Sequence, residues 1–181
     1  MTAATTSQTA GPYWHLIDFP EWADLLRPDG PNAGIEGGER IVLTGRITDG
    51  DGAPVTDAMV EIWQADPEGR YDGAFHGFGR CGTDANGMFR FVTLKPGPVP
   101  GRGNQTQAPH VVLTLFARGL LKQLVTRLYF EGETLNETDP LLQSIEPARR
   151  GTLIARPTGT PGEWRLDIRL QGENETVFLD V

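Results

Sequence analysis

From residue 40 onward, the chain is a succession of short segments in which apolar and polar residues alternate, separated by turn sequences. In residues 40–48, Ile41, Leu43 and Ile47 fall on one face of an extended strand, and Gly45 marks a bulge or a close contact. The same period recurs in residues 58–64, 88–94, 111–117, 124–130, 165–170 and 176–180. About seven short strands separated by turns predict an all-β fold, and we expect a β-sandwich.

Turn sequences and one helical stretch interrupt the strand pattern. Residues 49–52 read Asp-Gly-Asp-Gly, which predicts a tight hairpin turn because glycine readily adopts the positive φ that such turns need. Residues 84–87, Asp-Ala-Asn-Gly, predict a second turn. Residues 140–149 lack the alternation of a strand and predict a short helical insertion.

Residues 1–38 have little periodicity and are rich in Pro, Gly and Thr, which is typical of an extended arm. A short helix is expected near residues 21–26. Such an arm is ordered only where it lies on another surface, and its aromatic residues favour such a contact. We therefore divide the chain into an N-terminal arm, residues 1–38, and a β-sandwich domain, residues 39–181.

Charge and composition exclude several kinds of partner. The 181 residues carry a formal net charge of -8, so we expect no nucleic-acid partner and no anionic membrane surface. No apolar run approaches the length that spans a membrane, and the first residues lack the features of a secretory signal. The expected location is cytoplasmic. Cys81 is the single cysteine, so no internal disulfide can form.

Few residues suggest chemistry on local pattern alone. The three histidines, His15, His76 and His110, lack the spacing of a metal motif, and a structural or surface role is favoured for each. Arg118 follows Phe116 and Ala117 at the end of an apolar strand. It is either a strand-end arginine that reaches water or a clamp for a carboxylate, to which the planar guanidinium is well matched.

Several longer strings resemble the intradiol ring-cleavage dioxygenases. They occur in the order typical of that family and cover most of the chain. These strings are SQTAGPYWH at residues 7–15, VEIWQADPEGRY at 60–71, FGRCGTDANGMFRFVTLKPGPVP at 78–100, APHVVLTLFARG at 108–119, and LVTRLYFEGE at 124–133.

The resemblance implies a non-haem Fe(III) site in catalytic chains, held by two tyrosines and two histidines. In this chain Val99 stands where a KPGPYPW-like segment has its tyrosine, and Val112 replaces one histidine of a PAHIH-like segment while His110 is retained. The other tyrosine is expected upstream of the GRC sequence, whereas Tyr71 follows the earlier EGR sequence. We call Val99, His110 and Val112 the vestigial positions. Because valine offers no donor atom to a hard cation, we expect this chain to bind no metal.

Some members of the family are built from alpha and beta chains of the same fold, of which only beta keeps iron. The resemblance implies that this chain is the alpha kind, with no catalytic residue of its own, completing the substrate pocket of an Fe(III)-bearing beta chain in a hetero-oligomer of alpha–beta units. The implied reaction is O₂-dependent cleavage of 3,4-dihydroxybenzoate to 3-carboxy-cis,cis-muconate. By the same resemblance Thr9, Gly11 and Pro12 line that pocket, Arg118 faces the substrate carboxylate, and His110 is a structural remnant.

Two other functions are weighed against this one. A non-catalytic module, either a transthyretin-like or a carbohydrate-binding β-sandwich, shares the strand pattern but does not account for the arm sequence. An iron-binding homomeric dioxygenase keeps the chemistry but conflicts with Val99 and Val112.

Overall fold

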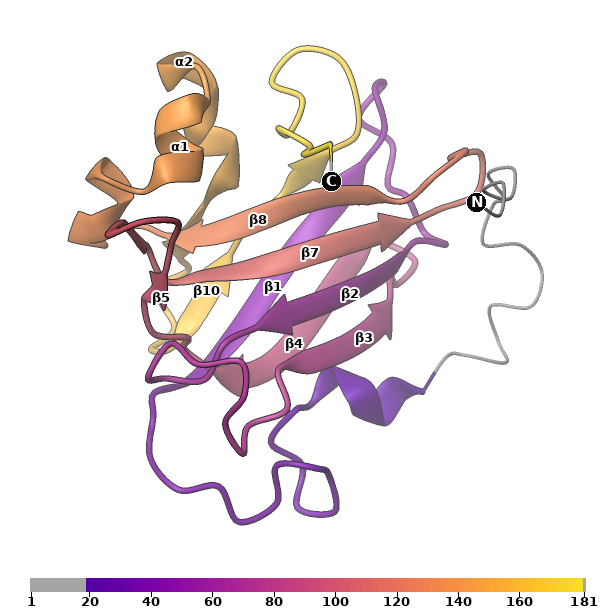
Figure 1. Ribbon diagram of the computed structural model, residues 1–181. Coiled ribbons are helices and arrows are strands. Elements are labelled where there is room, and N and C mark those ends of the chain that lie inside the picture. The colour runs from indigo at the N-terminus through magenta and orange to yellow at the C-terminus, as the bar shows by residue number, and fades with distance from the viewer. Residues whose placement is uncertain (1–18, 181) are drawn as a thin grey trace, which may run out of the picture.

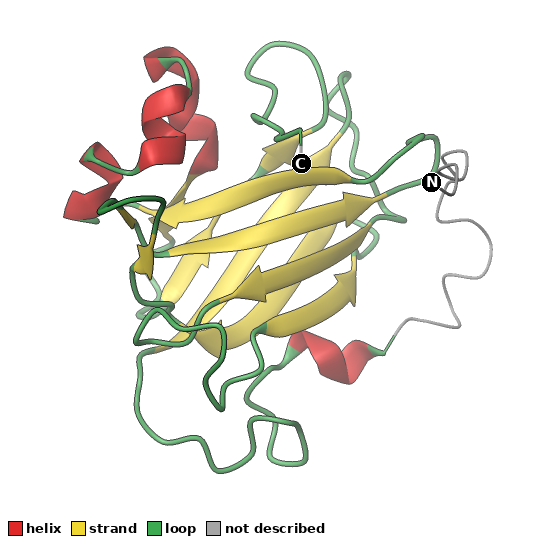
Figure 2. Cartoon of the chain, viewed as in Figure 1, coloured by secondary structure: helices red, strands yellow, loops and turns green. Residues whose placement is uncertain are grey.

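The computed structural model describes residues 19–180, which form two facing layers of strands (Figures 1 and 2). Hydrogen bonds join the strands of the two layers into one nearly closed sheet. One layer contains β1 (Arg40–Thr48), β4 (Met88–Leu94), β10 (Glu163–Arg165) and β11 (Ile168–Arg169). The other contains β2 (Met59–Gln64), β3 (Phe78–Gly82), β7 (His110–Phe116) and β8 (Leu124–Phe130). The all-β sandwich predicted from the alternation is confirmed.

Three further strands connect or flank these layers. β9 (Ile154–Pro157) pairs in parallel with β8 and antiparallel with β10, and so links the two layers. β5 (Val99–Pro100) and β6 (Thr106–Gln107) form a separate two-stranded pair beside the start of β7. β10 and β11 both run parallel to β1, which lies more than 100 residues earlier in the chain. The layer behind β7 and β8 is thus assembled from segments that are far apart in the sequence.

The helices of residues 19–180 are short; the first packs beside β3, and the other four lie between β8 and β9 in the chain. They are η2 (Pro20–Ala23), η3 (Thr134–Glu137), α1 (Pro140–Ser144), α2 (Pro147–Arg150) and η4 (Gly151–Leu153). The predicted helical insertion is therefore two helices rather than one. Ile145 is extended, and Glu146, directly before Pro147, has a ψ of 129° outside the helical region, as expected for a residue that precedes proline. No helix in the described part of the chain has the length and hydropathy to cross a membrane.

Several strand bounds match the sequence predictions, and the C-terminal ones do not. Residues 165–170 do not form one strand, because Asp167 interrupts the ladder: its side-chain oxygen, rather than a backbone carbonyl, accepts the amide of Arg46 at 2.9 Å. Residues 176–180 form no regular strand and contribute one isolated bridge, between Val125 and Leu179.

The tight hairpin turn predicted at Asp-Gly-Asp-Gly is confirmed, since Thr48 and Pro54 on either side of it form an antiparallel bridge. Oδ1 of Asp49 accepts hydrogen bonds from the amides of Asp51 and Ala53, and Gly52 has a φ of 84°. After one bridge between Thr48 and Pro54, however, the chain leaves β1 and crosses to the other layer. The strand that pairs antiparallel with β1 is instead β4.

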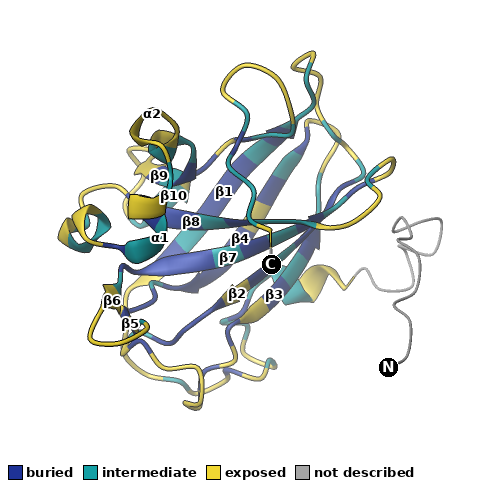
Figure 3. Cartoon of the chain, turned by 45° about the horizontal axis from the view of Figure 1, so that its top comes forward, coloured by how far each residue is buried: buried dark blue, intermediate teal, exposed yellow. Residues whose placement is uncertain are grey.

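The main core lies between the two layers, and most of its members sit on the inward faces of the strands (Figure 3). Gly45 is packed at its centre. A Cβ atom there would lie 2.0 Å from the carbonyl oxygen of Leu166 and 2.4 Å from the ring of Phe89. The close contact that the sequence suggested at Gly45 is confirmed, because no side chain fits at this position.

Candidate functional site

The vestigial positions lie at the end of the sandwich where β7 begins. His110 and Val112 alternate along β7 and therefore share its outer face, away from the main core. Val99 lies on β5 directly opposite Gln107 of β6. The side chain of Gln107 in turn meets Arg127 of β8, which lies directly opposite Val112. The structure thus brings the three vestigial positions to one region.

His110 is a buried, neutral imidazole. Its side chain is only 2% exposed, and its Nδ1–H donates to the carbonyl oxygen of Ala108 at 2.7 Å. Burial lowers the pKa of His110 to about 4, and the positive charge of Arg127 acts in the same direction. The retained histidine packs in a cluster with the ring of Tyr129.

Asp139 holds this cluster to the first helix. Its carboxylate caps α1 by accepting the amides of Leu141 and Leu142, and it also accepts the amide of Ala108 at 2.8 Å and the hydroxyl of Tyr129 at 3.1 Å. Asp139 and Tyr129 are both fully buried. Burial raises the pKa of Tyr129, so this phenol stays protonated and donates its hydroxyl hydrogen to Asp139.

Arg127 and Gln107, which no sequence motif singles out, belong to this region together with Tyr71. Nη1 of Arg127 donates to Oε1 of Gln107 at 2.8 Å and to the hydroxyl of Tyr129 at 3.3 Å. Tyr71 stacks on Trp63, which is the neighbour of Val112 on β2. Burial raises the pKa of Tyr71 and the charge of Arg127 opposes that rise. A charged residue within the apolar run 124–130 was the available signal for Arg127.

Arg118 lies apart from this cluster. It lies in a turn two residues after the end of β7 and eight positions after His110, a separation of at most about 26 Å for an extended chain. Its Nε donates to Oδ2 of Asp57 at 2.6 Å, and its side chain remains 83% exposed. The structure therefore does not bring Arg118 to the vestigial positions. Thr9, Gly11 and Pro12 lie outside the described residues.

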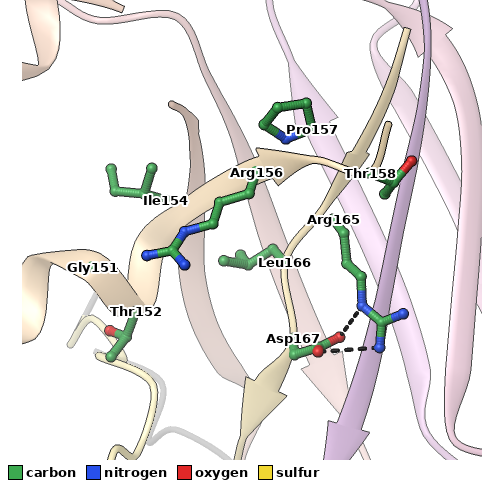
Figure 4. A pocket seen from close by; sticks show the side chains of 9 residues that line it. All are labelled: Gly151, Thr152, Ile154, Arg156, Pro157, Thr158, Arg165, Leu166 and Asp167. Atoms are coloured by element: carbon green, nitrogen blue, oxygen red, sulfur yellow. Dashed lines mark hydrogen bonds and ion pairs between the residues drawn. The ribbon is translucent and has the colours of Figure 1, made fainter. Parts of the chain in front are cut away.

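A separate hollow of about 440 Å³ lies beside β9 and β10 and contains none of the predicted site residues (Figure 4). Its two arginines already have carboxylate partners. Arg165 binds both oxygens of Asp167, at 2.9 and 3.1 Å, and Arg156 lies 3.5 Å from Glu131. The hollow therefore presents no uncompensated charge to a ligand.

Comparison with known proteins places the chain in a family. Residues 11–172 match a family model described as a dioxygenase. The protocatechuate 3,4-dioxygenase alpha chain of Pseudomonas putida is 42% identical, over 97% of this chain and 96% of that protein. This chain belongs to the intradiol dioxygenase family. The protocatechuate 3,4-dioxygenase beta chain of Burkholderia cepacia is 40% identical over 77% of this chain and 67% of its own length.

A solved structure agrees with the family assignment. The dioxygenase domain of a dioxygenase–carbohydrate-binding protein fusion from Streptomyces sp. SirexAA-E is 28% identical, covers 97% of this chain and 100% of that chain, and superposes with a TM-score of 0.64. The names of the relatives distinguish alpha and beta chains, which implies a hetero-oligomer. This intradiol dioxygenase chain resembles both kinds.

Intradiol dioxygenases are iron-dependent, so the donor atoms of this family member bear on its role. Of the three vestigial positions only His110 carries a donor atom, and the two valines present hydrocarbon. Within residues 19–180, no group of three or more His, Cys, Asp or Glu side chains is arranged to hold a metal ion. The vestigial positions of this intradiol dioxygenase do not fit Fe(III), a hard cation that requires anionic oxygen ligands.

The buried imidazole of this intradiol dioxygenase predicts a specific loss of stability in acid. The pKa of His110 is about 4 in the folded chain and about 6.5 in the unfolded chain, so between these values the unfolded state binds more protons. The free energy of unfolding should therefore fall by about 3 kcal/mol as the pH falls from 6.5 to 4. In His110→Gln the free energy of unfolding, measured with urea, should fall by about 3 kcal/mol less across this range than in the unsubstituted chain. His76→Gln, at an exposed position, is the control; an unchanged pH profile in His110→Gln would contradict the prediction.

Proposed function

We propose that this chain is the alpha subunit of a protocatechuate 3,4-dioxygenase and that it completes the substrate pocket of an Fe(III)-bearing beta chain. The assembled enzyme would cleave 3,4-dihydroxybenzoate with O₂ between its two hydroxylated carbons, giving 3-carboxy-cis,cis-muconate. The observation that carries the proposal is the 42% identity to an alpha chain over 97% of this chain. The donor-poor vestigial positions support the further proposal that the iron belongs to the partner and that this chain holds none.

The contribution of this chain would be positioning and electrostatics. Arg118 lies just beyond a strand end with most of its side chain exposed, so a neighbouring subunit can reach its guanidinium, although Asp57 of this chain also binds it. A planar guanidinium binds a carboxylate through two parallel hydrogen bonds and would orient the ring substrate against the partner's site. Thr9, Gly11 and Pro12 would form a wall of the same pocket, with the glycine and proline allowing close approach of the backbone.

Expression with and without a beta chain tests this proposal. The chain purified alone should contain no iron and have no dioxygenase activity, whereas co-expression should give a complex with iron and activity. Iron in the lone chain, measured by elemental analysis, would favour a homomeric dioxygenase instead. A chain that forms no complex with the beta chain would favour a transthyretin-like or carbohydrate-binding module, which the relatives do not favour.

A further inference from the structure

Arg127 lies among the three vestigial positions. It pairs with Val112 across β7 and β8, and the adjacent pair on the same face is His110 with Tyr129. Alternate residues along a strand point to the same side, so Arg127 and Tyr129 lie on the outer face beside His110 and Val112. On the other side of Val112 lies Trp63 with Tyr71 stacked on it.

The hydrogen bonds of Arg127 connect its guanidinium to the third vestigial position. Nη1 donates to Oε1 of Gln107, which is the residue directly opposite Val99, and to the hydroxyl of Tyr129. The guanidinium therefore extends over the sheet towards β6 rather than away into solvent. Its two hydrogen-bond partners lie on β6 and β8, which pair with the strands that carry Val99, His110 and Val112.

Among the described residues no carboxylate binds this guanidinium directly, and that of Asp139 is linked to it only through the hydroxyl of Tyr129. Within residues 19–180 Arg127 forms no ion pair, and the two groups that it contacts are a neutral amide and a protonated phenol. The side chain is partly buried, and a guanidinium stays charged at every accessible pH. The region around the vestigial positions therefore already contains a fixed positive charge.

We propose that the guanidinium of Arg127 takes the place of a metal ion at the vestigial positions. It supplies a positive charge among them, it donates hydrogen bonds where a metal would accept electron pairs, and it repels any cation that approaches. This charge and the missing donor atoms both prevent a metal ion from binding at the vestigial positions. The inference rests on the proposed function, since both assign the iron to the partner chain.

Restoring the donor atoms with and without the charge tests this inference. The substitutions Val99→Tyr and Val112→His add a phenol and an imidazole to those of Tyr71 and His110. They are made in the full chain, co-expressed with its beta partner, in three versions that retain Arg127, carry Arg127→Gln or carry Arg127→Lys. Glutamine keeps a hydrogen-bonding amide without the charge, and lysine keeps the charge without the planar fork.

With Arg127→Gln, the complex should gain a second iron per alpha–beta pair and a stronger visible absorption from phenolate–iron bonds. The versions with arginine or lysine should retain at least tenfold less of this second iron. Equal loading of the arginine and glutamine versions would overturn the inference, and so would the absence of a second iron from all three. A second iron in the unsubstituted complex would instead overturn the proposed function, so the two failures are distinguishable.

A single substitution provides a second test if the multiply substituted variants fail to fold. Val112→His alone places two imidazoles on alternate residues of β7, and its affinity for Zn²⁺ is measured by calorimetry with and without Arg127→Gln. We expect Zn²⁺ to bind at least tenfold more tightly once the guanidinium is removed. Equal Zn²⁺ affinities would show that Arg127 does not occupy the site and would overturn the inference.

Discussion

Replacing Arg118 with glutamine in the assembled enzyme should lower kcat/KM for 3,4-dihydroxybenzoate about 10- to 100-fold, because a charged hydrogen bond to a carboxylate contributes about 1.5–3 kcal/mol. The value for unsubstituted catechol should change little, since catechol has no carboxylate to bind. The iron content should stay the same because Arg118 lies up to about 26 Å along the chain from the vestigial positions and would contact only the substrate. Steady-state kinetics with the two substrates measure the ratio.

Two variants on the same chain serve as controls for Arg118. Arg156→Gln removes another exposed arginine and should leave both substrates unaffected. Asp57→Asn removes the carboxylate that binds Arg118 in the isolated chain while keeping the guanidinium. It should retain the preference for the carboxylated substrate. If Arg118→Gln kept the normal preference, Arg118 would not be the residue that recognises the carboxylate.

Replacing Asp139 with alanine should destabilise the chain by about 4 kcal/mol. The change removes a helix cap, which costs about 1 kcal/mol, and leaves the buried amide of Ala108 and hydroxyl of Tyr129 without their acceptor, at about 1–3 kcal/mol each. For a chain of this size the melting temperature should fall by about 10 °C. Thermal unfolding of the complex, followed by circular dichroism, measures the shift.

Two further variants test whether the loss of stability in Asp139→Ala comes from the hydrogen bonds of Asp139. Asp139→Asn keeps one acceptor oxygen and should lose less stability than Asp139→Ala. Asp29→Ala removes an exposed carboxylate that lies 3.8 Å from Arg27 and should change stability by no more than about 0.5 kcal/mol. If Asp139→Ala and Asp29→Ala melted at the same temperature, the hydrogen bonds of Asp139 would not stabilise the fold as we infer.

The strands were predictable where burial on one face alternates with exposure on the other. The bounds of β1, β4 and β8 coincide with the alternating runs in the sequence. The C-terminal prediction was wrong because a side chain, Asp167, replaces a backbone acceptor in the ladder, and apolar alternation does not reveal such a substitution. The tight turn after β1 was predictable from its sequence, but local turn chemistry does not specify that β4 becomes the antiparallel neighbour of β1.

The candidate site was predictable only in part. Val99, His110 and Val112 were found through family resemblance, and the structure brings them together. Arg127 was missed because its importance depends on the register between β7 and β8, which places it opposite Val112. Gln107 was missed because it matters only through pairing with Val99 and contact with Arg127. Such relations between strands are long-range, and the local sequence shows only an arginine within an apolar run, not the residues that it meets.

The parallel pairing of β10 and β11 with β1 affects how this chain is made in the cell. A ribosome adds residues 163–169 long after residues 42–48, with which they pair, have left the exit tunnel. Until then one edge of β1 has no partner, and the nascent chain exposes apolar surface that later becomes core. The sandwich is completed only after residues 163–169 emerge, because the second edge of β1 has no partner until then.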